Sequence, residues 1–375
     1  MQFRDLKKQY QVLKTDIDRA MAEVAASGAF IMGTPVKELE EQLAEYVGVK
    51  HCRSCANGTD ALTLALKAWN VGEGDAVFVP DFTFFASAEV VALEGATPVF
   101  VDVDPNTFNI DPQSLRNAIA AVREEGRLMP RVVIAVDLFG LPAPFNEICS
   151  IAADEGLLVL EDGAQGFGGS IGEQKACSFG DIATTSFFPA KPLGCYGDGG
   201  AVFTNNDEWA TLIDSYRVHG KGSFKYDNVR IGMNSRLDTL QASILQVKLK
   251  AFSDYELADV NTAAATYSKL LGSQPKIICP TIPEGFGSSW AQYTLRLDKS
   301  TDRATLQAAL KEIGIPTMVY YPTPMSSQTA FKGCQKYIDT PIAHELSQRV
   351  LSLPIHPYIT HEEVCLVTEK LVDNL

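Results

Sequence analysis

Residues 181 to 204 read Asp-Ile-Ala-Thr-Thr-Ser-Phe-Phe-Pro-Ala-Lys-Pro-Leu-Gly-Cys-Tyr-Gly-Asp-Gly-Gly-Ala-Val-Phe-Thr, and two β-prone runs in this stretch enclose one lysine, Lys191. The lysine stands between Pro189 and Pro192. Each proline ring fixes its own φ and restricts the residue before it, so the backbone around Lys191 has little freedom. This arrangement could hold the lysine amine against an aldehyde, with which an amine forms a Schiff base. The alternative is a solvated lysine in a turn, because most lysines are surface residues.

The composition is that of a globular protein with two domains. The chain has 375 residues, of which 46% are hydrophobic and 21% charged, and this length is large for a single core. The net charge is −14 and no run of basic residues occurs, so we expect no nucleic-acid partner. The amino terminus lacks the apolar core of a signal peptide and no apolar run is long enough to span a membrane. We therefore expect no membrane association and a cytoplasmic location.

The cysteines indicate a reducing compartment. Of the eight cysteines, Cys52 and Cys55 form one Cys-x-x-Cys pair, and no second pair lies at zinc-ribbon spacing. We interpret the pair as reduced thiols near a buried strand end, with a metal or redox role as the weaker alternative. No metal site is predicted.

The pattern of apolar runs predicts an α/β fold. Strands are expected at residues 76–80, 97–104, 131–137 and 157–162, with helices between them at α/β spacing. The run at 131–137 is nearly continuous, which is typical of a parallel strand buried on both faces. We expect a large mostly parallel-sheet domain over residues 1–250. A smaller α+β domain is expected over residues 251–375, with strands at 293–297 and 317–321 and a last helix opened by a capping box of Thr360 and Glu363.

Polar residues lie where the predicted strands end, and open α/β sheets bind ligands at this edge. Glu161 and Asp162 end one strand, and their side chains point to opposite faces if the strand continues, so at most one faces a given ligand. Phe84 follows another strand and could stack on a flat ring or belong to the core. Gly58 and Thr59 open a helix, whose amino terminus suits a phosphate. The alternative there is a plain helix cap.

Five motifs taken together resemble a known family. They are residues 57–62 (Asn-Gly-Thr-Asp-Ala-Leu), 161–165 (Glu-Asp-Gly-Ala-Gln), 186–194 (Ser-Phe-Phe-Pro-Ala-Lys-Pro-Leu-Gly), 197–200 (Gly-Asp-Gly-Gly) and 234–237 (Asn-Ser-Arg-Leu). Their order and spacing resemble the DegT/DnrJ/StrS group of pyridoxal-phosphate-dependent sugar aminotransferases. The resemblance covers nearly the whole chain, from residue 5 to residue 357.

This resemblance implies a PLP-dependent transferase fold of type I, like that of aspartate aminotransferase, and a homodimer with active sites at its interface. It implies that Lys191 holds the aldehyde of pyridoxal 5'-phosphate and shuttles the proton. Asp162 then pairs with the pyridine nitrogen and keeps it protonated, which makes the ring an electron sink. The other implied cofactor contacts are Gln165 at the ring hydroxyl, Phe84 stacked on the ring, Gly58, Thr59 and Ser186 around the phosphate, and Asn234 from the partner subunit.

The resemblance also implies the reaction. Family dehydratases carry histidine where this chain has Lys191, so amino transfer is favoured. L-Glutamate is the expected donor, and a keto sugar on a nucleoside diphosphate is the expected acceptor, giving an amino sugar for a surface polysaccharide such as O-antigen. The residues around Lys191 are similar to those of members that aminate the 3-keto position of a UDP-N-acetylhexosaminuronate.

The contacts to the sugar are less defined by sequence. The similar members have His-Tyr-Pro near the sugar, whereas this chain has Tyr320, Tyr321 and Pro322. Arg236 is the candidate partner of the uronate carboxylate, and an interface salt bridge is the alternative. Tyr321, His219 and His356 are the other candidate substrate residues, although an isolated histidine is more often structural.

Three other activities stay open at this point. The chain could aminate a 4-keto sugar or a dTDP-linked 3-keto sugar. It could be a sugar dehydratase that uses pyridoxal or pyridoxamine phosphate. It could also be a catalytically silent binding subunit, although Lys191, Asp162 and Gln165 together argue against this.

Overall fold

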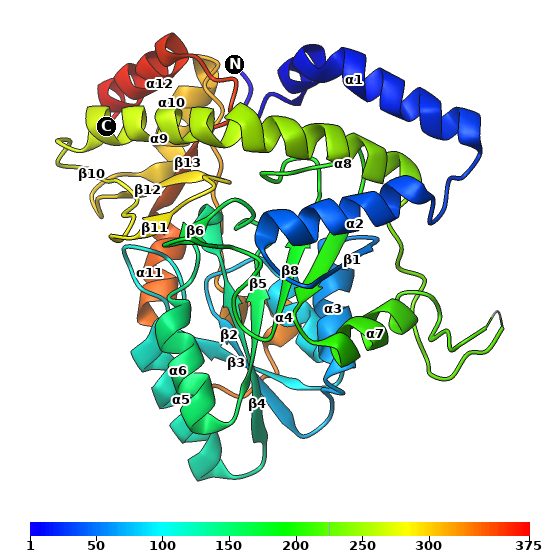
Figure 1. Ribbon diagram of the computed structural model, residues 1–375. Helices are drawn as coiled ribbons and strands as arrows, with labels where there is room; N and C mark the ends of the chain where they lie inside the picture. The colour runs from blue at the N-terminus through cyan, green and yellow to red at the C-terminus, as the bar shows by residue number, and fades with distance from the viewer. Residues whose placement is uncertain (225) are drawn as a thin grey trace.

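The computed structural model describes residues 1–224 and 226–375, and a seven-stranded sheet forms its centre (Figure 1). The strand order is β1-β9-β8-β5-β4-β2-β3, in which β8, β5, β4, β2 and β3 run parallel. Strand β9 pairs antiparallel with β8 on one side and with β1 on the other. The bounds are β1 His51–Cys55, β2 Asp75–Pro80, β3 Thr97–Val101, β4 Met129–Val136, β5 Leu158–Asp162, β8 Ile182–Ser186 and β9 Gly200–Thr204.

Helices cover both faces of this sheet and continue into a smaller carboxyl-terminal part (Figure 1). Their bounds are α1 Leu6–Ser27, α2 Thr34–Val47, α3 Gly58–Ala68, α4 Ala86–Leu93, α5 Pro112–Glu125, α6 Phe145–Glu155, α7 Asp207–Tyr216, α8 Thr239–Ala251, α9 Leu257–Leu271, α10 Arg303–Glu312, α11 Pro341–Arg349 and α12 His361–Asp373. The large α/β domain and the mostly parallel sheet that the sequence predicted are confirmed.

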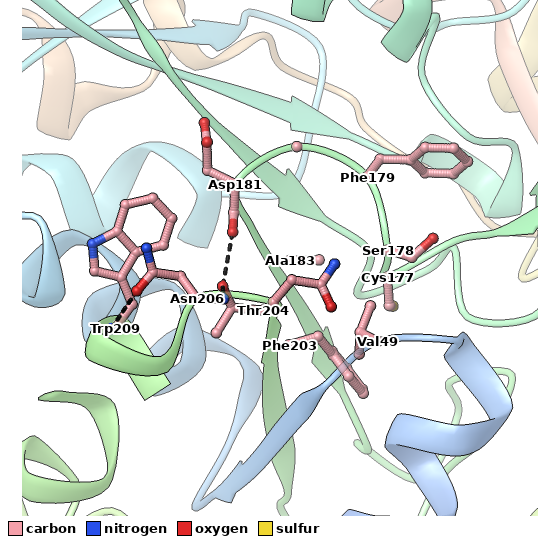
Figure 2. Close-up of a pocket in the computed structure, with 12 residues that line it drawn as sticks. Val49, Cys177, Ser178, Phe179, Asp181, Ala183, Phe203, Thr204, Asn206 and Trp209 are labelled. Carbon is pink, nitrogen blue, oxygen red and sulfur yellow. Dashed lines mark hydrogen bonds between the residues drawn. The ribbon is translucent and has the colours of Figure 1, made fainter. Parts of the chain in front are cut away.

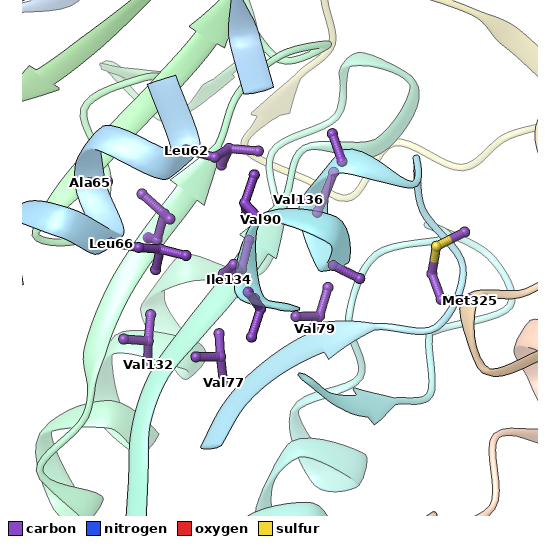
Figure 3. Packing of buried hydrophobic residues seen from close by; sticks show 14 of the residues in the cluster. Leu62, Ala65, Leu66, Val77, Val79, Val90, Val132, Ile134, Val136 and Met325 are labelled. Atoms are coloured by element: carbon purple, nitrogen blue, oxygen red, sulfur yellow. The ribbon is translucent and has the colours of Figure 1, made fainter. Parts of the chain in front are cut away.

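The alternation of side chains along β4 explains why its sequence is a continuous apolar run. Val132 and Ile134 pack in one core cluster with α3 and α4 (Figure 3), whereas Val133 and Ala135 pack in a second cluster with α5 and α6. Successive residues of a strand point to opposite faces, so a strand covered by helices on both sides needs apolar residues throughout.

The smaller part is built on a three-stranded sheet of order β10-β12-β13, packed against α9, α10 and α12. The bounds are β10 Ile277–Ile278, β12 Tyr293–Leu297 and β13 Val350–Leu353, and a further small sheet joins β11 Phe286–Gly287 to β6 Ser170–Ile171 and β7 Gln174–Lys175. The division of the chain at residue 250 stays a prediction. Residue 250 lies inside α8, and Met325 and Leu346 pack in the core of the large sheet.

The predicted strand at 317–321 is wrong. Met318 forms one isolated bridge with Ser352, and no named strand covers this segment. Pro316 and Pro322 flank the segment, and because proline cannot donate a ladder hydrogen bond, pairing does not extend. The predicted capping box is confirmed, since Thr360 and Glu363 bond reciprocally at the start of α12. In the described ranges we find no helix with the length and apolar character needed to span a membrane.

Candidate active site

A cavity of about 680 Å³ lies at the carboxyl ends of the parallel strands. It is lined by Asn57, Gly58, Thr59, Asp60, Leu62, Thr83, Phe84, Ala86, Val136, Asp162, Ala164, Gln165, Ser186, Phe188, Ala190, Lys191, Asp198, Gln292, Tyr320 and Tyr321. Eight of the predicted site residues are therefore brought to one cavity, as expected for this edge of an open α/β sheet. These eight are Gly58, Thr59, Phe84, Asp162, Gln165, Ser186, Lys191 and Tyr321.

The amino terminus of α3 forms one end of the cavity. Asn57 caps the helix, because its side chain accepts a hydrogen bond of 2.8 Å from Asp60 N. A Cβ atom added to Gly58 would lie 2.7 Å from Ser186 Cβ, so only glycine lets the helix approach the end of β8 this closely. The first N–H groups of a helix have no acceptor within the helix and carry partial positive charge. This end of the cavity is therefore suited to an anion, and the same helix end is also capped by Asn57.

Asp162 supplies a buried carboxylate to the cavity. Its side chain is 4% exposed and accepts hydrogen bonds from Ser87 Oγ at 2.7 Å and from Ala164 N at 3.3 Å. Burial raises the pKa of Asp162, while the Ser87 hydrogen bond and the charge of Lys191 act in the opposite direction. A carboxylate buried to this extent is stabilised in its charged form by a cationic partner.

Glu161 points away from the cavity, as the alternation along the strand predicted. Its carboxylate accepts the backbone N–H of Cys177 and, at 2.7 Å, that of Phe179. Burial raises the pKa of Glu161 well above its usual value, and the neighbouring Asp137 adds to the effect. Of the two carboxylates that end β5, Glu161 therefore holds the segment at Cys177 and Phe179, and Asp162 faces the cavity.

Lys191 lies on a loop that we name the lysine loop, residues 187–199. The two ends of the loop are joined by a backbone hydrogen bond of 2.7 Å from Phe187 N to Gly199 O. A second backbone bond, of 2.8 Å, runs from Cys195 N to Phe187 O. Burial lowers the pKa of Lys191 to about 8, the charge of Asp162 opposes this, and the charge of Arg4 adds to it. A lowered pKa leaves more of the amine neutral and nucleophilic near pH 7.

Gln165 and Tyr321 form a fixed hydrogen-bonded pair on the wall of the cavity. Gln165 Oε1 accepts from Phe139 N at 2.7 Å, which directs Nε2 to donate to the Tyr321 hydroxyl at 3.0 Å. Burial raises the pKa of Tyr321, so its hydroxyl keeps a proton that it can donate. Phe84 lies with its ring centroid 6.2 Å from that of Tyr321 and is 52% exposed, so its ring is accessible from the cavity rather than part of the core.

Four predicted site residues do not line this cavity. His219 and Arg236 line a separate hollow of about 960 Å³, together with Lys221 and Arg230. Asn234 is exposed and bridges to Val218 nearby in the chain. A second group of positive side chains is thus gathered outside the first cavity.

His356, the fourth of these residues, is buried near Arg4. It is 4% exposed, and its Nδ1 has no hydrogen-bond partner among the described residues. Burial, together with the charge of Arg4, lowers the pKa of His356 to about 4, although the charges of Asp5 and Glu363 act in the opposite direction. The imidazole is therefore neutral near pH 7.

Figure 2 shows another hollow, of about 330 Å³, which lies between Val49, the segment 177–181 and the first turn of α7. Its polar groups bond one another, as Thr204 Oγ1 donates to Asp181 O at 3.0 Å and Trp209 N donates to Asn206 Oδ1 at 3.1 Å. The predicted site residues all lie in the described ranges, and none of them lines this hollow. It is not the candidate active site.

Sequence reasoning missed several residues of the first cavity. They are Asp60, Phe188, Asp198, Gln292 and Tyr320 on its walls, and Ser87 beneath Asp162. Asp60 lies within the motif at residues 57–62, and Asp198 lies within the motif at residues 197–200. A local sequence signal was therefore present for both residues. Ser87 is 75 residues from Asp162, and no local pattern links the two.

An open, mostly parallel sheet with an amine and a buried carboxylate in one cavity at its carboxyl edge is the arrangement of a fold type I PLP-dependent enzyme. Comparison with known proteins agrees with this class. Residues 11–372 match the DegT/DnrJ/EryC1/StrS aminotransferase family. A DegT DnrJ EryC1 StrS aminotransferase from Brucella abortus has a similar crystal structure, with a TM-score of 0.96, 46% identity and coverage of 99% of this chain and 98% of that chain.

The chain belongs to the DegT/DnrJ/EryC1/StrS aminotransferase family and is a PLP-dependent nucleotide-sugar aminotransferase by that membership. One relative is the UDP-2-acetamido-2-deoxy-3-oxo-D-glucuronate aminotransferase of Pseudomonas aeruginosa, which is 44% identical over 373 residues and covers 100% of both chains. The structure of NtdA from Bacillus subtilis, with bound cofactor PMP, is 29% identical with a TM-score of 0.86, covering 96% of this chain and 81% of that chain. The predicted family and cofactor are confirmed.

Proposed function

We propose that this enzyme transfers the amino group of L-glutamate to the 3-keto position of a UDP-linked N-acetylhexosaminuronate. The observation that carries the choice of substrate is the full-length, 44% identical relative from Pseudomonas aeruginosa, which acts on UDP-2-acetamido-2-deoxy-3-oxo-D-glucuronate. The lysine at position 191 supports amino transfer over dehydration. The product would be an amino sugar for a surface polysaccharide such as O-antigen.

The cavity offers a group for each part of pyridoxal phosphate. The partial positive charge at Gly58 and Thr59, with the Ser186 hydroxyl, suits the phosphate. The buried Asp162 carboxylate suits the pyridine nitrogen, and the Lys191 amine suits the aldehyde. When bound, the cofactor supplies an aldehyde for amines and a protonated ring that withdraws electrons.

Side chains of this protein supply the proton transfer and the contacts that would hold the ring. We propose that Lys191 Nζ would hold the cofactor covalently. When the amine is free, we assign to it the removal of the proton from the amino-bearing carbon of the donor in one half-reaction and the delivery of a proton to the keto carbon of the acceptor in the other. An ionised Asp162 carboxylate would pair with the ring nitrogen and favour its protonated form. Phe84 would cover the ring face, and Gln165 and Tyr321 would offer hydrogen bonds at the ring edge.

We further propose that the active site is completed by a second copy of the chain. A nucleotide sugar brings two phosphate charges, and a uronate adds a carboxylate. Yet Lys191 is the one cation among the described residues that line the cavity, beside Asp60, Asp162 and Asp198. Three other cations, Lys221, Arg230 and Arg236, lie instead in the hollow that also contains His219.

Exposed apolar side chains beside this hollow favour a protein surface as its neighbour. Ile231 is 91% exposed, Phe224 is 68% exposed and Val229 is 55% exposed. We propose a two-fold dimer that buries them and brings the hollow of one subunit to the cavity of the other. The symmetry of such an interface then completes both sites in the same way. Arg236 would then reach the substrate carboxylate, and Asn234 the phosphate, from the partner.

Mixed dimers test the shared site. Lys191→Ala and Arg236→Ala are each expected to be inactive alone, because each homodimer lacks one component at both sites. After refolding or subunit exchange of equal amounts, half of the dimers should be mixed, and each of these should contain one intact site. We expect activity to return to about one quarter of the parental value. If the activity stays at the level of the separate variants, Arg236 either acts in the same site as the Lys191 of its own subunit or acts in no active site.

A panel of keto nucleotide sugars tests the substrate. The panel contains UDP-3-keto-N-acetylglucosaminuronate, its neutral 3-keto-N-acetylglucosamine counterpart, a dTDP-3-keto sugar and a UDP-4-keto sugar, each with L-glutamate. We expect the uronate to have the highest kcat/KM, with 2-oxoglutarate formed in equal amount and the new amine located at C3 by NMR. A preference for the 4-keto or the dTDP-linked sugar would refute the proposed substrate. Loss of water without 2-oxoglutarate would favour the dehydratase.

We also place this enzyme in the cytoplasm. All eight cysteines are free thiols, and Cys52, Cys55, Cys177 and Cys195 are buried. Free thiols persist in a reducing compartment. The burial of Cys52 and Cys55 at β1 agrees with the interpretation of that pair as reduced thiols at a strand end.

A further inference from the structure

Two cations from distant parts of the chain hold the main chain of the lysine loop. Arg4 Nη2 donates to the carbonyl of Lys191 at 2.8 Å and to that of Pro192 at 3.4 Å. Lys248 Nζ donates to the carbonyl of Gly194. The loop contains prolines that cannot donate, and it has no regular secondary structure, so its carbonyls need donors from elsewhere. Arg4 is the donor that acts at the catalytic lysine itself.

The residues around Arg4 are anchored on both sides. Phe3 packs edge-on against Tyr320, a wall of the cavity, with ring centroids 6.2 Å apart. Asp5 caps α1 by accepting a hydrogen bond of 2.9 Å from Lys8 N. Helix α1 lies along α8, as Figure 1 shows, so the start of the chain is held against the large domain. The contact between Arg4 and the lysine loop is therefore part of a packed structure rather than a chance contact of a loose terminus.

Arg4 also contributes charge. The charged groups that act on the Lys191 amine are Asp162 and Arg4, which oppose each other. Arg4 in turn interacts with Glu256, and burial lowers the pKa of Arg4 to about 10, so the guanidinium is charged near pH 7. A like charge near an amine disfavours its protonated form.

We propose that Arg4 is a positioning residue for Lys191, which fixes the main chain of the lysine loop and places a permanent positive charge near the lysine amine. Both effects favour an amine that is neutral and correctly placed for reaction. The inference rests on the proposed role of Lys191 and extends it to a residue 187 positions earlier in the chain.

The experiment measures the lysine amine directly. The full-length enzyme is freed of cofactor, and the rate of acetylation of Lys191 by a small reagent is followed from pH 6 to pH 11 by mass spectrometry of its peptide. Arg4→Met removes the charge and both hydrogen bonds, whereas Arg4→Lys keeps the charge. Lys7→Met is the matched control, because it removes a cation from an exposed position on the same segment. The kcat and KM for glutamate are measured on the loaded enzymes.

For Arg4→Met we expect the acetylation midpoint of Lys191 to rise by roughly 0.5 to 1 pH unit. We expect kcat to fall by about 10- to 100-fold, because the amine is displaced, while KM for glutamate changes by less than about threefold. Arg4→Lys should keep the parental midpoint and lose only part of kcat. Lys7→Met should behave as the parent.

An unchanged midpoint in Arg4→Met would overturn the inference even if thermal stability fell, since this outcome would leave Arg4 a purely structural role. An equal shift in Lys7→Met would also overturn it, because the effect would then be one of overall charge. If Arg4→Met does not fold, Arg4→Gln removes the charge while keeping a hydrogen-bond donor. The acetylation midpoint of Lys191 in that variant then tests the inference in the same way. Failure of the proposed role of Lys191 would be seen separately, as retained activity of Lys191→Ala.

Discussion

Replacing Lys191 with alanine is expected to lower kcat for amino transfer by at least about a thousandfold, because both the covalent attachment and the proton transfer are lost. The purified variant should also lose the yellow absorbance of the attached cofactor, or retain the cofactor only without covalent attachment. Stopped assays of 2-oxoglutarate and absorbance spectra measure the two effects.

The lowered pKa of Lys191 makes its amine reactive near pH 7. An amine with a pKa of about 8 is neutral in about one molecule in ten at pH 7, against about one in three thousand at the ordinary lysine value of 10.5. Lys191→Arg is the matched control, because it keeps a positive charge but cannot attach the aldehyde. Turnover of either variant within tenfold of the parent would rule out Lys191 as the attachment point.

Replacing Asp162 with asparagine should lower kcat by about 100- to 1000-fold. The amide keeps the size of the side chain and can still accept from Ser87, but it has no charge to hold a protonated ring nitrogen. The electron-withdrawing power of the cofactor then falls, and the proton transfer step slows. The rate of the half-reaction with glutamate, followed by cofactor absorbance in a stopped-flow instrument, measures this step.

Ser87→Ala is the control for Asp162. It removes one hydrogen bond of 2.7 Å from the carboxylate but leaves the charge, so we expect a smaller loss of about tenfold. If Asp162→Asn kept the parental half-reaction rate, the carboxylate would not act on the cofactor ring. If Ser87→Ala lost as much as Asp162→Asn, the position of the carboxylate would matter more than its charge.

Much of the fold and the centre of the site could be predicted because the signals are local. The apolar run at 131–137, the carboxylates that end β5 and the helix start at Gly58 each depend on a few neighbouring residues. The parallel topology then brings the ends of these strands to one edge. Gly58 and Asp162 were candidates for this reason and Lys191 because of its flanking prolines, and the family resemblance then implied their roles. The opposite orientation of Glu161 followed from the alternation along a strand.

The supporting contacts could not be predicted because they join distant parts of the chain. Arg4 reaches Lys191 across 187 residues, and Ser87 reaches Asp162 across 75. Nothing in the local sequence around either residue indicates its partner. The prediction of a strand at 317–321 was wrong because β-prone residues form a strand only where they pair with a neighbouring strand. Here the pairing is limited to the bridge between Met318 and Ser352.

The attachment of the cofactor to Lys191 is tested most directly by reducing the loaded enzyme with borohydride, which fixes the linkage, and mapping the modified residue by peptide mass spectrometry. We expect one modified lysine per chain, Lys191, and no modification when the enzyme has first been converted with excess L-glutamate, which releases the lysine. Modification of a different lysine, or of none in an enzyme that is yellow and active, would contradict the account.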